Sequence, residues 1–358
     1  MKLCKHSTWL RVIRQNDQSG LEIFDRLEKL KSIFPDGEER FPNVIFLLGN
    51  QQKICAFQNF GVSHLQSNSK RANGEVCVFA THVPTLQGNL EPFLVFDASS
   101  SSAHGANKTY RAPLCHESNV HKVALERNGG LEDLIHHRLL LPFSDVVCLF
   151  VDDLGGIAKV IKRLETWLSQ PDSFSVTGIR PWLVFVVDKE LQGDSQTTIR
   201  DLFQGKTKKA AEALFQGYRI FYLSVEGPQT RARRARRESQ WDRLHREILA
   251  LSQLSRRKRR KEDLLLSFSH ISELLRCAAG YLTNLDPRPF DIVRASRLKN
   301  PTATDLQVHL TTFLRTMRSP AAVVDFGIPM IASALILDHY PPGMHCESND
   351  HGCGLGAN

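Results

Sequence analysis

Residues 43–61, NVIFLLGNQQKICAFQNFG, decide the fold of this chain. The six residues from Asn43 to Leu48 are almost all apolar, which is typical of a strand buried on both faces of a parallel sheet. Gly49 and polar residues interrupt the run, and QKICAFQNF follows with the composition of a helix or a loop. We therefore predict a strand, a glycine turn and a helix, the unit from which α/β domains are built.

Apolar strands alternate with helical segments along the next 170 or so residues. Further strands are predicted over five ranges: 75–83, 92–98, 145–153, 181–190 and 218–227. This alternation predicts an α/β sheet covered on both faces. Beyond about residue 229 only helical periodicity continues, and the apolar residues of 328–337 predict a buried helix that closes the module. We expect four parts: a helical lead-in over 1–42, an α/β domain over 43–228, an all-helical module over 229–345 and a disordered tail over 346–358.

The loop after the first strand departs from the Walker A pattern of nucleoside triphosphatases. In that pattern glycines let backbone N–H groups wrap the phosphates, a lysine reaches the outer phosphates, and a hydroxyl binds magnesium. Counted from Gly49, the second glycine, the lysine and the hydroxyl fall on Ile54, Cys55 and Ala56. Lys53 lies two positions early. The loop has the place of a phosphate-binding loop without its residues.

The order of elements over roughly residues 43–227 resembles the G domain of small GTPases. LVFDASSSSAHG stands where that family has its Asp-x-x-Gly magnesium switch, and LVFVVDKE stands where it has its guanine-reading Asn-Lys-x-Asp. The motifs are eroded, because Ser100 replaces the switch glycine and the second stretch lacks the asparagine. Asp97 matches the switch aspartate, the alternative being a structural carboxylate at a strand end. The resemblance implies a mostly parallel, P-loop NTPase-like (GTPase-like) sheet. It also implies four candidates for nucleotide contacts: Gly49, Lys53, Asp97 and Asp188.

The last third carries a second resemblance. FDIVRASRLKNP and MIASALILDHYPPGMH, supported upstream by LLPFSDVVCLFVDDLGG, are similar to the amino-terminal region of large fungal multidomain proteins with a patatin-like phospholipase domain. In that family a G-domain-like region and a helical module precede the lipase. The glycine-rich oxyanion loop, the Gly-x-Ser-x-Gly nucleophile and the Asp-Gly dyad of the lipase do not occur in this sequence. The resemblance therefore implies shared architecture without lipase activity.

The positive charge is concentrated in one segment. The chain has a formal net charge of +8, whereas residues 231–261 alone, with 13 Lys/Arg and three Asp/Glu, carry +10. Two clusters, RARRARR and RRKRRK, hold most of these cations. A solvated helix face is the plain interpretation, and nuclear import or polyanion binding is the alternative. The cluster residues concerned are Arg233, Arg234, Arg236, Arg237, Arg256, Arg257, Lys258, Arg259, Arg260 and Lys261.

Apolar residues recur between the two basic clusters at spacings of three and four. Such spacing places them on one face of a helix, which we expect to pack against the protein body. The residues are Trp241, Leu244, Ile248, Leu251 and Leu254. Apart from Trp241 the segment has no aromatic residues for stacking bases, which weighs against single-strand recognition.

Cysteine usage and hydropathy indicate the compartment. The eight cysteines are scattered, several of them inside apolar strands, which favours a reducing environment over a disulfide framework. HCESNDHGC (345–353) matches no standard zinc spacing, so we expect no metal there. No apolar run approaches the roughly 18 residues of a membrane span, and the first residues carry too many charges for a signal peptide. We expect a cytoplasmic location, with a nuclear one as the alternative.

These observations favour a non-catalytic regulatory or protein-interaction module with an eroded P-loop NTPase-like fold, a protein partner and no cofactor. The missing Walker residues, and the lack of a Gly-x-Ser-x-Gly or metal-site motif, argue against an enzyme. One alternative is a nucleotide-binding switch that takes GTP or ATP with magnesium. Another is a nuclear or nucleic-acid-associated factor that acts through residues 231–261.

Overall fold

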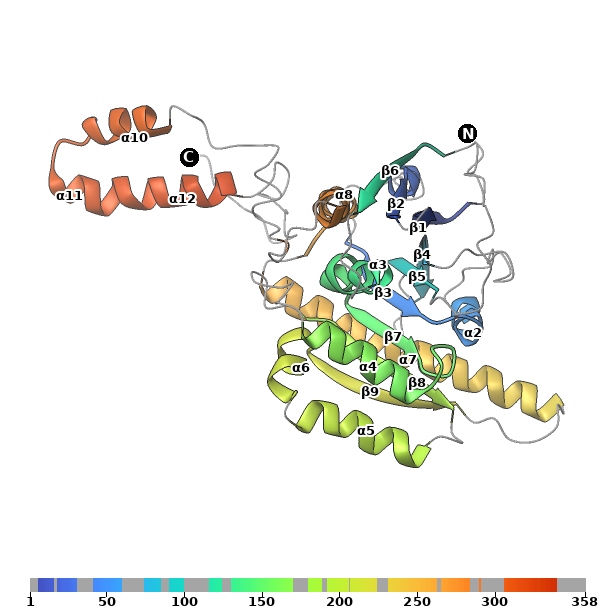
Figure 1. Ribbon diagram of the computed structural model, residues 1–358. Helices are drawn as coiled ribbons and strands as arrows, with labels where there is room; N and C mark the ends of the chain where they lie inside the picture. The colour runs from blue at the N-terminus through green and yellow to red at the C-terminus, as the bar shows by residue number, and fades with distance from the viewer. Residues whose placement is uncertain are drawn as a thin grey trace. The chain divides into compact units, whose positions relative to one another are not determined.

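The computed structural model divides the chain into two compact units, Met1–Phe290 and Asp291–Asn358 (Figure 1). The residues that the structure describes are 6–15, 18–30, 41–59, 74–84, 90–99, 116–123, 130–169, 180–188, 192–205, 207–223, 231–262, 265–283, 290 and 306–339.

The first unit is a mixed α/β domain built on one sheet, in which nine strands are described, in the order β6-β2-β1-β4-β5-β3-β7-β8-β9. The strands are β1 (Thr8–Gln15), β2 (Gln18–Phe24), β3 (Asn43–Leu48), β4 (Glu75–Pro84), β5 (Leu90–Ala98), β6 (Ser118–Val123), β7 (Val146–Phe150), β8 (Trp182–Asp188) and β9 (Gly217–Leu223). From β5 to β9 every pairing is parallel, with β3 between β5 and β7. From β6 to β5 every pairing is antiparallel.

The predicted α/β class and its six strands are present, but the sheet is mixed rather than mostly parallel. The difference comes from β1, β2 and β6, which sequence reasoning missed. The helical lead-in predicted over 1–42 is wrong for β1 and β2, and α1 (Arg26–Leu30) is the helix described there. Leu21, Phe24, Leu27 and Leu30 recur every three residues, which suits a helix face. The first two of these residues nevertheless lie in β2, which is held extended by its pairing with both β1 and β6.

Helices cover both faces of the parallel block (Figure 1). Alternate side chains of a strand point to opposite faces. Ile45 and Leu47 join the core cluster that includes residues of α7 (Arg231–Lys261), and α2 (Gln52–Asn59) also packs against α7. On the other face Phe46 meets the ring of His136, which meets Trp167 of α4 (Ile157–Leu168). Each fully buried side chain of this size contributes about 1.5–3 kcal/mol.

Further helices pack around the same unit. They are α3 (Leu131–Leu134), the π-helix η3 (Ile135–Leu140), the 3-10 helix η4 (Leu141–Phe143), α5 (Gln192–Gln204), α6 (Lys208–Leu214) and α8 (Phe268–Thr283). Phe203 of α5 stacks on Tyr218 of β9 at 4.2 Å between ring centroids. Since α7 and α8 belong to the sheet unit, the boundary lies near residue 290 instead of 229.

The apolar face predicted for α7 is confirmed at its first four positions. Trp241, Leu244, Ile248 and Leu251 are at most 5% exposed, whereas Leu254 is 44% exposed. In the last turns Ser252 and Ser255 are the buried residues, and Ser255 Oγ donates a hydrogen bond to Asp145 O at 3.2 Å. Small side chains let the end of α7 approach the first residues of the strands, which turns Leu254 outward.

The second unit is described as helices over residues 306–339. They are α10 (Leu306–Arg315), α11 (Pro320–Ala322), the π-helix η6 (Val323–Gly327) and α12 (Ile328–His339). The side chain of Ser319 accepts the N–H of Ala322, which caps the start of α11. The helix predicted over 328–337 is confirmed by α12, but its predicted burial is wrong, because Ile328 is 54% and Met330 48% exposed. The predicted tail, 346–358, lies outside the described residues.

Candidate functional site at the carboxyl edge of the parallel strands

The central strand β3 ends where open α/β sheets bind ligands. Such sites lie beyond the carboxyl ends of the strands, at the point where successive strands are added on opposite sides. Here β5 lies on one side of β3 and β7 on the other. The loop from Gly49 to Gln51 leads from β3 into α2 at this point, so it is the place to examine for a site.

The start of α2 is occupied by a carboxylate of the protein itself. One oxygen of Asp153, Oδ2, accepts the backbone N–H of Asn50 at 2.7 Å and that of Gln52 at 2.9 Å. The Asn50 side-chain amide donates to Asp153 O at 3.2 Å. The free N–H groups at a helix N-terminus attract anions. Asp153, in the turn that follows β7, is the anion bound there.

Gly49 is required by the closeness of this contact. A Cβ added to Gly49 would lie 2.8 Å from Phe150 Cβ and 2.9 Å from Asp153 Oδ2, closer than real Cβ contacts. The missing side chain of Gly49 therefore lets Phe150 and the Asp153 carboxylate lie against the loop, and it does not leave an open space for a phosphate.

Lys53 points into the protein and pairs with Asp97. Its side chain is 1% exposed, that of Asp97 is fully buried, and Nζ lies 2.6 Å from Asp97 Oδ1. The same ammonium donates to Ala98 O at 2.6 Å. A buried charge must be paired and hydrogen-bonded to be tolerated. The pair ties α2 to the end of β5.

Three of the four predicted nucleotide-contact residues are thus brought together. Gly49, Lys53 and Asp97 lie at one edge, joined by hydrogen bonds from Gly49 N and Lys53 Nζ to Ala98 O. Asp188 ends β8, where it pairs with Leu223, and its side chain lies outside the described residues.

From the sequence, Asp153 is expected to be an acidic strand end, with magnesium binding as the alternative, and its contact with the loop is not predicted. The available signal is the pair of glycines that follows. Gly155 and Gly156 have φ angles of 87° and 96°, which favour glycine, and they form the turn into α4. Two acidic residues, separated from the glycines by Leu154 alone, indicate a carboxylate that can fold back onto the neighbouring loop.

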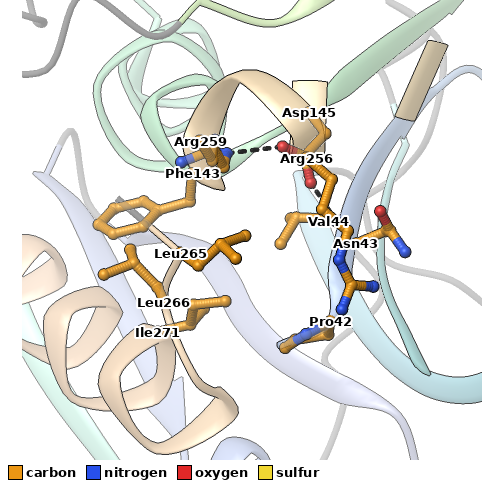
Figure 2. A pocket seen from close by; sticks show the side chains of 10 residues that line it. All are labelled: Pro42, Asn43, Val44, Phe143, Asp145, Arg256, Arg259, Leu265, Leu266 and Ile271. Atoms are coloured by element: carbon orange, nitrogen blue, oxygen red, sulfur yellow. Dashed lines mark hydrogen bonds and ion pairs between the residues drawn. The ribbon is translucent and has the colours of Figure 1, made fainter. Parts of the chain in front are cut away.

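The opposite, amino-terminal edge of the sheet has a small cavity (Figure 2). Its volume of about 20 Å³ suits a single water molecule. Its lining residues are Pro42, Asn43, Val44, Phe143, Asp145, Arg256, Arg259, Leu265, Leu266 and Ile271.

Two arginines of the predicted polyanion cluster bind carboxylates of the protein beside this cavity. Asp145 Oδ1 accepts Arg259 Nε at 2.7 Å, and Asp145 Oδ2 accepts the N–H of Val44 at 2.8 Å. Arg256 Nη1 lies 3.8 Å from Glu91 Oε2. Arg256 and Arg259 therefore help to hold the end of α7 against the sheet domain, a structural role that the prediction of a polyanion or nuclear-import cluster did not include.

The remaining cluster residues divide in two groups. Arg257, Arg260 and Lys261 are exposed at the end of α7, and Lys258 is half-buried. The side chains of Arg233, Arg234, Arg236 and Arg237, in the first turns of the helix, lie outside the described residues.

Two adjacent histidines of η3 are buried under the sheet. Burial, and then the charges of Arg163 and Lys53, hold the pKa of His136 well below its usual value. His137 stacks on Trp167 with ring centroids 6.4 Å apart. His136 is thus a neutral core residue near neutral pH.

No family model matches this chain, and no curated protein matches it. Among the described residues, none of the helices combines the length and apolar composition needed to cross a lipid bilayer.

Proposed function

We propose that this protein is a non-catalytic regulatory or protein-interaction module on a P-loop NTPase-like scaffold that works without nucleotide. The observation that carries the proposal is the Asp153 carboxylate on the N–H groups of Asn50 and Gln52. These N–H groups stand where a phosphate-binding loop presents its own to a ligand. In this chain a built-in anion takes them.

The arrangement of the strands supports the scaffold. β3 leads into the loop and lies centrally, the β4–β5 pair lies on one side, and β7, β8 and β9 follow in parallel on the other. This agrees with the order of elements by which the sequence resembles small GTPases. Kinship with the amino-terminal region of the patatin-associated fungal proteins, and a cytoplasmic or nuclear location, belong to the same proposal.

The charges at the edge also disfavour a bound nucleotide. An incoming phosphate would meet the carboxylate of Asp153, and Lys53 would have to leave Asp97 to reach it. Breaking a buried ion pair by removing one partner costs about 3–5 kcal/mol. Ala56 also supplies no hydroxyl for magnesium at the required position.

Calorimetric titration with GTP and with ATP, each with magnesium, tests the proposal. We expect a dissociation constant weaker than about 100 μM and no hydrolysis, because an affinity of 1 μM would need about 8 kcal/mol from a loop that lacks its phosphate ligands. A micromolar affinity that is lost in Lys53→Arg, with the fold intact by circular dichroism, would establish the nucleotide switch instead. Lys53→Arg keeps the buried positive charge while moving its donors.

A further inference from the structure

The last two turns of α7 place cations on two sides of the helix. Arg256 and Arg259 face the protein and pair with Glu91 and Asp145. Arg257, Arg260 and Lys261 are exposed. Among the described residues, no acidic side chain forms an ion pair with any of these three. One surface of the helix end therefore carries three exposed positive charges outside these ion pairs, named here the α7 cation face, with Glu262 as the next residue along the chain.

This arrangement works against the helix itself. Arg257 lies three residues before Arg260 and four before Lys261, and like charges at those spacings destabilise a helix. The helix dipole favours cations in the last turn. The dipole does not explain why three cations lie on one side of the helix. It also does not explain Arg257, which precedes the last turn. A polyanion held against the face would remove the repulsion.

The surroundings of the face indicate which polyanion fits. A membrane-surface helix needs an exposed apolar face, whereas the apolar face of α7 is buried in the core at Trp241, Leu244 and Ile248. A protein partner would need an apolar or aromatic anchor, but Leu254 is the one large apolar side chain of α7 that is markedly exposed among those described. Guanidinium groups match phosphate oxygens in bidentate geometry.

We propose that the α7 cation face, Arg257, Arg260 and Lys261, binds the phosphate backbone of duplex nucleic acid without reading its sequence. Phosphate contacts of this kind give affinity and salt dependence, whereas base contacts give specificity. The absence of exposed aromatic residues on the described part of α7 favours a duplex over a single strand. This inference is independent of the function proposed above, because that proposal rests on the start of α2, whereas this one rests on the end of α7.

Fluorescence anisotropy with a labelled 24-base-pair DNA duplex tests the inference on the full chain. With three phosphate contacts we expect the logarithm of the association constant to fall with that of the salt concentration at a slope of about −2.7, so that 200 mM salt weakens binding about 40-fold relative to 50 mM. A second duplex of unrelated sequence should bind within about twofold.

The decisive variant is Arg257→Gln/Arg260→Gln/Lys261→Gln. We expect it to weaken binding at least tenfold at 50 mM salt and to flatten the salt slope. The matched control, Arg200→Gln/Lys208→Gln/Lys209→Gln, removes three exposed cations from α5 and α6 and should change affinity less than twofold. All six side chains are exposed, so both variants should fold like the wild type, and the α7 variant, freed of its like-charge repulsion, should melt no lower.

Three outcomes would overturn the inference. They are no duplex binding at 50 mM salt, equal loss in the variant and the control, and unchanged binding in the α7 variant. Binding to vesicles of one part phosphatidylserine and three parts phosphatidylcholine that the variant loses, without duplex binding, would assign the face to a membrane.

Discussion

The ammonium of Lys53 lies 2.6 Å from Asp97 Oδ1, and both side chains are almost completely shielded from solvent. This pair joins the helix after the central strand to the end of the neighbouring strand. Its isolation from water has two consequences. The lysine is not available to an outside phosphate. Removing one member of the pair should also lower the free energy of unfolding strongly, because the other charge stays buried.

Removing either charge alone should therefore destabilise the protein strongly. We expect Lys53→Met and Asp97→Asn each to lower the free energy of unfolding by about 3–5 kcal/mol, since each leaves a buried charge without its partner. The double variant should be more stable than the sum of the two losses predicts. Urea unfolding of the four proteins measures this coupling. Additive losses would show that the two residues do not act as a pair.

The contact between Asp153 and the loop should stabilise the start of α2. Asp153→Ala leaves the N–H groups of Asn50 and Gln52 without their acceptor, and we expect a loss of about 1–2 kcal/mol in urea unfolding. Asp153→Asn keeps an acceptor without the charge and should lose less. Asp152→Asn is the matched control, because Asp152 Oδ2 accepts a longer hydrogen bond from the side chain of Gln52, 3.4 Å from Nε2, and not from a backbone N–H of the loop. Equal losses at 152 and 153 would contradict the assignment.

The parallel half of the sheet could be predicted from the sequence because its strands are buried on both faces. NVIFLL and VVCLF are continuous apolar runs, and such runs indicate strands without knowledge of their partners. β6, SNVHKV, is a mostly exposed strand beside β2 with no such run. Its strand conformation depends on pairing with residues about a hundred positions away, which local periodicity does not record.

The candidate site could be predicted in part for the same reason. The strand ends fixed the positions of Gly49 and Asp97. The partner of Lys53 and the role of Asp153 depended on side chains meeting across the sheet. Asp153 lies 103 residues from Asn50 along the chain. The spacing of residues within the loop therefore showed that phosphate ligands were missing, but not what had taken their place.

Adding a single methyl group at Gly49 should lower the stability of the protein, because the loop lies so close to β7. Gly49→Ala would place a Cβ against Phe150 Cβ and the Asp153 carboxylate, and overpacking of this kind costs about 1–3 kcal/mol. The matched control is Gly280→Ala in α8, where an added Cβ meets no heavy atom within 4 Å. Replacing a helical glycine with alanine should stabilise by about 0.5–1 kcal/mol. Thermal melting should separate the two variants in opposite directions, and a stable Gly49→Ala protein would contradict the geometry.

Buried and half-buried histidines should make the fold sensitive to acid. Burial is the largest cause that lowers the pKa of four of them below its usual value of about 6.5: His116, His136, His245 and His270. Between the folded pKa and 6.5 the unfolded chain binds more protons than the folded one, so stability falls as the pH drops below 6.5.

His136 should contribute most clearly to this loss. Its ring lies between Phe46 and Trp167, and its Nδ1 has no hydrogen-bond partner among the described residues. If a histidine stays neutral in the folded protein, the free energy of unfolding falls by about 2 kcal/mol between pH 7 and pH 5, because the unfolded chain takes up the proton. His136→Phe fills the same site without a titrating group. We expect its free energy of unfolding to fall by about 2 kcal/mol less than that of the wild type between pH 7 and pH 5. Urea unfolding at the two pH values measures it, and an unchanged pH dependence in the variant would show that His136 becomes protonated within the fold.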